Sequence, residues 1–169
     1  MTMADLASQL RAARRRPLFD ANALPRVEYG REVVHAHLPH RGPMSLVDGV
    51  RGFDPETGRA HGFRRVAASD PGFDGHFPDA PVYPGVLAVE MVGQLALLAA
   101  SLRRGTSDAR DVRLTRVLEA SFCAPIAPDT DATLLCEPVA DDDFLLTSVG
   151  QVLVGDTVAC VCAFEAMWI

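Results

Sequence analysis

The sequence predicts an α+β fold in which a curved antiparallel sheet encloses one long, buried helix. Residues 85–104 are apolar on every side, and a helix of that kind must be surrounded by other elements. The residues before and after it form short β-rich runs separated by turn signals, with two strands expected before the helix and four after it. Wrapping these strands around the helix is the simplest way to bury it.

The N-terminal residues are expected to lie outside this arrangement. Residues 4–15 have a helical pattern, with Leu6 and Leu10 one turn apart, and Pro17 ends that pattern. The following residues, up to position 30, are expected to be irregular. We therefore divide the chain into an N-terminal extension (1–30) and one folded domain (31–169).

Turn residues set the bounds of the domain's elements. A strong turn signal, Asp-Pro-Glu-Thr-Gly at 54–58, predicts a hairpin, and Gly105 suits the end of the helix. A loop rich in Gly, Pro and Asp lies between the hairpin and the helix. The last four strands are expected to form an antiparallel meander. The expected strands are 46–53, 59–66, 112–122, 132–139, 144–154 and 157–164.

Composition favours a cytoplasmic protein with neither a cofactor nor a metal. A chain of 169 residues can bury a core without disulfides, and its net charge of −6 argues against nucleic acid as a partner. Its four cysteines lack C-x-x-C spacing and are expected to be reduced thiols. Residues 86–102 are apolar enough for a membrane span, but the carboxylate of Glu90 within them would cost about 2.5–3.5 kcal/mol. No membrane association is expected.

The segment from position 75 to 94 contains the candidate reactive groups. His76 lies in a loop stiffened by Gly and Pro, and Gly85 opens the helix, where backbone N–H groups are free. Glu90 is the only acid in the apolar stretch, and Gln94 follows it by one turn. A single loop histidine is usually inert, and a lone interior acid can be purely structural. Gln94 could orient Glu90 or only fill a polar gap.

Together these groups suit the elimination of water from a 3-hydroxyacyl thioester. His76 can remove the α-proton, because its ordinary pKa of about 6.5 is close to the working pH. Glu90, with a pKa expected to be raised by burial, can protonate the leaving hydroxyl. The amide of Gly85 can stabilise the oxyanion. The neighbouring side chains expected to bind substrate are Phe77, Val86 and Gln94.

The same segment resembles the β-hydroxyacyl-acyl-carrier-protein dehydratases of bacterial type II fatty-acid synthesis. In that family the His of Gly-His-Phe-Pro is catalytic and an acid follows fourteen residues later, as His76 and Glu90 do here. The Gly of Pro-Gly-Val supplies the backbone donor and matches Gly85. Residues 38–48, Leu-Pro-His-Arg-Gly-Pro-Met-Ser-Leu-Val-Asp, resemble the family's opening motif. The likeness extends over roughly residues 38–166.

The resemblance implies a hotdog fold and a lyase. The implied reaction converts a (3R)-3-hydroxyacyl group, held on the phosphopantetheine of an acyl carrier protein, into a trans-2-enoyl thioester during fatty-acid or polyketide and polyene assembly. It also implies a homodimer, or a trimer of such dimers, in which His76 of one subunit meets Glu90 of the other. Glutamate at position 90 favours dehydration without isomerisation.

Some residues depart from the family pattern. Phe122 is followed by Cys123 and Ala124 where basic residues are usual, and residues 128–130 replace a Pro-Gly-Asp turn. An acidic carrier protein needs positive charge near the site. The arginines that could supply it are Arg14, Arg15, Arg16, Arg64, Arg65, Arg103 and Arg104.

Two other functions are compatible with the predicted fold. A hotdog acyl-thioesterase normally has an acid on the helix and lacks the Gly-His-Phe-Pro histidine. A non-catalytic acyl-binding or scaffold subunit would be expected to lose either the histidine or the acid. The presence of both His76 and Glu90 argues against these alternatives.

Overall fold

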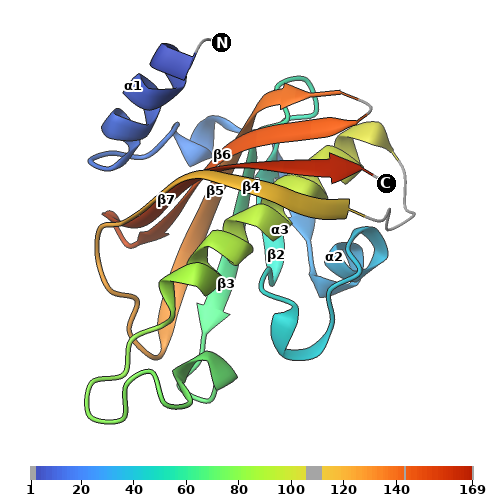
Figure 1. Cartoon of the computed structure of the whole chain (residues 1–169). Coiled ribbons are helices and arrows are strands. Elements are labelled where there is room, and N and C mark those ends of the chain that lie inside the picture. The colour runs from blue at the N-terminus through green and yellow to red at the C-terminus, as the bar shows by residue number, and fades with distance from the viewer. Residues whose placement is uncertain (1–2, 106–111, 143, 169) are drawn as a thin grey trace.

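A computed structural model describes residues 3–105, 112–142 and 144–168 (Figure 1). Its seven strands form one antiparallel sheet in the order β1-β2-β3-β5-β6-β7-β4, which curves around the long helix α3 (Gly85–Arg104). The predicted hotdog arrangement of a helix enclosed by a sheet is therefore confirmed. The strands are β1 (Arg26–Tyr29), β2 (Gly49–Phe53), β3 (Ala60–Val66), β4 (Val112–Phe122), β5 (Thr130–Asp141), β6 (Leu145–Val154) and β7 (Thr157–Trp168).

Helix α3 begins and ends at the residues that the sequence predicts. Gly105 adopts the left-handed conformation, with φ of 64°, and its N–H donates to the carbonyl of Leu102. The side chains of Met91, Leu95 and Leu98 are fully buried. By length and mean hydropathy (1.8) α3 could cross a membrane, yet 61% of its apolar 18-residue window is buried inside the fold. The sheet supplies the surroundings that its apolar surface requires.

The order of the last four strands differs from the predicted meander. Strands β5, β6 and β7 follow one another as expected, but β4 pairs with β7 and forms one edge of the sheet. Helix α3 crosses the concave face of the sheet, so the next strand, β4, joins the sheet at the edge far from β3. Residues 123–129 then lead back to β5. The antiparallel pairing of β4 with β7 runs from the pair Val112 and Trp168 to the pair Phe122 and Cys160.

The first part of the N-terminal extension forms a second layer on the outer face of the sheet (Figure 1). Helix α1 (Met3–Ala13) buries Leu6 and Leu10 against outward-facing side chains of the sheet, among them Val161 of β7. Residues 17–30 were expected to be irregular, but Arg26–Tyr29 within them forms the edge strand β1. A further short helix, α2 (Arg31–His37), was also not foreseen. The division of the chain at residue 31 stays a prediction.

Candidate functional site

A loop between β3 and α3 holds His76 in a fixed orientation. The ring atom Nδ1 lies 2.8 Å from the carbonyl oxygen of Val82. Because a carbonyl can only accept, Nδ1 must be the protonated nitrogen, and the neutral ring therefore keeps a free lone pair on Nε2. The backbone N–H of His76 donates to the carbonyl of Phe73, and its carbonyl accepts from the N–H of Val82. The ring also stacks on exposed Phe77, with centroids 4.3 Å apart.

An ion-pair network beneath this loop anchors it to the sheet. The guanidinium of Arg64 donates to Asp70 (2.7 Å) and to Asp48 (3.1 Å), and Asp70 in turn accepts from the N–H of Gly72 (2.9 Å). Burial, followed by the nearby charge of Asp70, raises the pKa of Tyr83 to about 12. Arg64 is therefore an internal anchor of the loop. It is not available as a docking residue, which the sequence had left open.

His76 and the first turn of α3 line one pocket of about 460 Å³. Gly85 is one of its walls, and a Cβ added at this position would lie only 2.7 Å from the ring of Phe122. Because glycine has no side chain, the pocket extends to the start of the helix, where backbone N–H groups carry partial positive charge. The lining is largely apolar and comprises His76, Val82, Tyr83, Pro84, Gly85, Val86, Ala88, Phe122, Cys123, Ala124, Pro125, Ile126, Ala159 and Cys160.

Glu90 belongs to a second polar cluster. Its Oε1 accepts from Gln94 Nε2 (2.8 Å) and lies 3.4 Å from His40 Nε2. Gln94 is itself fixed, because it donates to the carbonyl of Met44 and accepts from the N–H of Leu46, both at 2.8 Å. The carboxyl of Glu90 is thus partnered and its side chain is 32% exposed. The sequence predicted an acid in the interior; in the single chain Glu90 is instead partly exposed, because this face of α3 is left open by the sheet.

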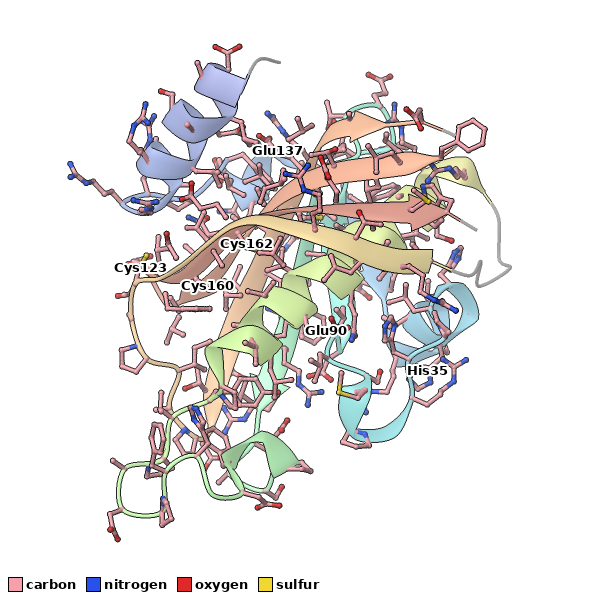
Figure 2. All side chains as sticks on the ribbon, in the orientation of Figure 1. His35, Glu90, Cys123, Glu137, Cys160 and Cys162 are labelled. Atoms are coloured by element: carbon pink, nitrogen blue, oxygen red, sulfur yellow. The ribbon has the colours of Figure 1, made fainter. Side chains whose placement is uncertain are left out.

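A single chain does not bring His76 and Glu90 together. Among residues 3–105, 112–142 and 144–168 no hydrogen bond, ion pair or ring contact joins them, and Glu90 is absent from the lining of the His76 pocket. Glu90 follows Gly85 by five positions, which places them about 7.5 Å apart along α3 and about 140° apart around it. In Figure 2, Glu90 lies on the side of α3 that faces α2 and His35, whereas Cys123 and Cys160 of the pocket lie on the other side.

The four cysteines are free thiols. Burial raises the pKa of Cys136 to about 12, whereas a hydrogen bond with Cys162 lowers that of Cys160. Cys123 is exposed and lines the His76 pocket. Within the described part of the chain, no three His, Cys, Asp or Glu side chains gather in a way that could hold a metal ion.

Most of the candidate docking arginines are engaged in ion pairs. Arg65 pairs with acids of β5 and its preceding turn, Arg103 and Arg104 with Asp141, and Arg14 with Glu119. Arg15 and Arg16 are exposed at the end of α1, and their side chains form no ion pair with any residue that the structure describes. These two are therefore the candidates left with free charge.

Comparison with known proteins identifies relatives. The model of the FabA-like domain matches residues 38–161. The chain is 30% identical over 131 residues to the 3-hydroxyacyl-[acyl-carrier-protein] dehydratase FabZ of Syntrophotalea carbinolica, covering 78% of this chain and 88% of that protein. It is 32% identical over 142 residues to the FabZ of Novosphingobium aromaticivorans, covering 83% and 89%.

Solved structures share the fold at low sequence identity. The dehydratase heterocomplex ApeI:P of Xenorhabdus doucetiae superposes with a TM-score of 0.70 at 17% identity, covering 80% of this chain and 90% of that one. A hypothetical thioesterase with coenzyme A from Streptococcus pneumoniae gives 0.54 at 12% identity, covering 71% and 84%. At these identities the likeness extends to the fold alone.

Proposed function

The chain belongs to the FabA-like family, and from that membership and the geometry of the site we propose that it dehydrates (3R)-3-hydroxyacyl thioesters to trans-2-enoyl thioesters. The observation that supports this most directly is the fixed tautomer of His76, whose free Nε2 shares an apolar pocket with the start of α3. A base and an anion-stabilising helix end are thus already assembled in one chain. The two FabZ relatives are named for the same reaction.

The proposed elimination uses three groups. Nε2 of His76 removes the proton from C2 of the acyl chain while the C2–C3 double bond forms. The N–H of Gly85 and the dipole of α3 stabilise negative charge on the thioester oxygen. Protonated Glu90 donates its proton to the departing C3 hydroxyl, which leaves as water. Gln94 keeps the carboxyl of Glu90 in place, and Phe77 and Val86 border the bound acyl chain.

We propose that Glu90 comes from a second copy of the chain, so that a homodimer is the smallest active unit. The strand β4 is an open edge of the sheet, and Leu114 and Val117 on it are 55% and 49% exposed. Val86 of α3, next to the His76 pocket, is 71% exposed. An unpaired strand edge with apolar side chains readily pairs with another chain. A trimer of such dimers is compatible with the same unit.

We propose an acyl carrier protein as the partner that delivers the substrate. Burial, and then Cys160, raise the pKa of the Cys123 thiol at the rim of the pocket, and the charge of nearby Arg14 acts in the opposite direction. Arg15 and Arg16 follow Arg14 directly and have free guanidinium groups. An acidic carrier would be attracted to this end of α1. The four free thiols favour a reducing, cytoplasmic location.

The reaction is tested with purified protein and 3-hydroxyacyl thioesters of several chain lengths, by following enoyl absorbance. Both His76→Ala and Glu90→Ala should abolish turnover without unfolding the protein, whereas Glu90→Asp should retain part of it because the acid is only one methylene shorter. Release of free thiol without an enoyl product would contradict dehydration and indicate a thioesterase. The absence of any product would favour a binding subunit.

Mixing two inactive variants tests the shared site. If His76 and Glu90 act across a dimer, half of the randomly mixed dimers of His76→Ala and Glu90→Ala contain one intact site of two. The mixture should then recover about one quarter of the wild-type activity. Samples of each variant alone, taken through the same unfolding and refolding, serve as controls. A mixture that stays inactive would show that both groups act within one subunit.

The docking proposal has its own test. The double variant Arg15→Glu and Arg16→Glu should raise KM for substrate on a carrier protein while leaving turnover of a small pantetheine thioester unchanged. Arg103→Glu, at the far end of α3, is the matched control. Equal KM values for the carrier-bound substrate in all three proteins would remove this end of α1 from the docking surface.

A further inference from the structure

His40 lies in the loop after α2, and its ring lies beside the carboxyl of Glu90. Its Nε2 is 3.4 Å from Glu90 Oε1. The other ring nitrogen, Nδ1, is buried and has no hydrogen-bond partner among the residues that the structure describes. A buried polar atom without a partner lowers stability, so packing alone does not explain an imidazole at this position. The one polar side chain that its ring approaches among the described residues is therefore the proposed acid.

Other hydrogen bonds fix the positions of both His40 and Glu90. The guanidinium of Arg41 fixes the loop by donating to the carbonyls of Leu38 (2.6 Å), His40 (2.7 Å) and His35 (2.8 Å). Gln94 fixes the carboxyl of Glu90 from the helix side. A small closing movement would bring His40 and Glu90 into hydrogen-bond range, as catalytic contacts often tighten when substrate is bound.

The environment of His40 makes its protonated form more acidic. Burial is the largest influence and lowers its pKa; the carboxylate of Glu90 acts in the opposite direction, and the charge of Arg41 adds to the lowering. A protonated His40 is therefore a stronger acid than an ordinary histidine. Its side chain is still 23% exposed, so solvent can reach it.

The proposed reaction leaves a proton imbalance between two groups. Each turnover places one proton on His76 and removes one from Glu90, which must regain it before the next substrate reacts. We propose that His40 is the positioning residue that returns this proton to Glu90. In this step the Nε2–H bond of the imidazolium breaks and the Oε1–H bond of Glu90 forms. A solvent proton then rebinds at Nε2, while the sealed Nδ1 keeps its hydrogen throughout.

This inference rests on the proposed function, and its test begins with wild-type protein that forms enoyl product. His40→Ala removes the ring, and His40→Gln keeps an N–H donor near Glu90 but cannot carry a proton. Both should lower kcat roughly 10- to 100-fold with little change in KM, less than the 10²- to 10⁴-fold of direct proton transfer, because water can reprotonate Glu90 slowly. Added imidazole should restore the activity of His40→Ala.

The matched control is His35→Ala, which removes a neighbouring ring that contacts the Ser45 hydroxyl (3.1 Å) instead of Glu90. It should keep a wild-type kcat and show no response to imidazole. A wild-type kcat in His40→Gln would overturn the proposal, because a hydrogen bond alone would then suffice. A loss in both His40 variants that imidazole does not rescue would overturn it as well. Failure of the wild type to form product would instead refute the proposed function.

Discussion

Gln151 of β6 is predicted to be the main attachment of the N-terminal extension. Its side chain is fully buried. Its Oε1 accepts from the N–H of Leu18 (3.0 Å), and its Nε2 donates to the carbonyls of Ala13 (2.5 Å) and Arg16 (2.9 Å). One amide therefore joins the sheet to three points of a segment that has few other polar contacts with it. We expect Gln151→Leu to release this segment.

The magnitude follows from the three hydrogen bonds. Each contributes roughly 0.5–1.5 kcal/mol net, or about 1.5–4.5 kcal/mol together. Leucine regains part of this by burying apolar surface, and the freed backbone groups can reach water once the segment lifts. We therefore expect a loss of about 2–3 kcal/mol, which corresponds to a roughly 30- to 150-fold larger open population of the extension. Leu6 and Leu10 still hold α1 by their burial.

Trypsin provides the assay, because Arg14, Arg15 and Arg16 lie beside the attachment point. Cleavage after Arg14 and Arg15 should accelerate in Gln151→Leu in proportion to the open population, while the sheet unfolds at nearly the wild-type urea concentration. The bond after Arg16 is resistant because Pro17 follows it. Gln9→Ala, which removes a partly exposed contact of α1 with Glu137, is the control and should change cleavage little. Equal cleavage rates in the wild type and Gln151→Leu would refute this account.

Three further outcomes are expected. Gly150→Ala should destabilise the protein by at least about 3 kcal/mol in urea unfolding, because its Cβ would lie 1.7 Å from Val92 Cγ1 in the core; Gly93→Ala, which meets open space on α3, should instead stabilise it by about 0.5–1 kcal/mol. Cys123 should be the first thiol alkylated in the folded protein, and bound substrate should slow that reaction in a mass-spectrometric time course; labelling at a buried thiol first would contradict this. The pKa of Tyr83 is raised to about 12 from 10.0, so its contribution to stability is complete below pH 10 and lost as the pH rises toward 12; Tyr83→Phe should make that alkaline decline shallower, and an unchanged slope would contradict it.

The sequence predicted those parts of the fold whose signals are local. Helix α3 is recognisable because its apolar surface continues around all sides and ends at a glycine. The edge strand β1 was harder, because Arg26–Tyr29 is only four residues long and is defined by its pairing with β2. The position of β4 beside β7 depends on where α3 delivers the chain, which no local pattern records.

In the candidate site, too, the sequence predicted the residues with local signals and missed those defined by contacts between distant segments. His76, Gly85 and Glu90 were recognised by residue type and spacing within one segment. His40 was not, because it reaches Glu90 from a motif fifty residues earlier in the chain. Arg64 was only a candidate docking residue, since nothing in the sequence shows that Asp48 and Asp70 converge on it. Contacts of this kind join segments that are far apart in the chain, so no local sequence pattern predicts them.

The position of α1 has a consequence for handling the protein. The family match begins at residue 38, so a shortened gene designed on that boundary would lack the entire cover of the outer face. The apolar side chains exposed by such a cut would be Leu135, Val149, Leu153, Val158 and Val161. A bare apolar patch of this kind promotes aggregation. Poor expression of the shortened chain would then result from the loss of α1 from the outer face of the sheet. It would not be evidence against the proposed catalytic activity.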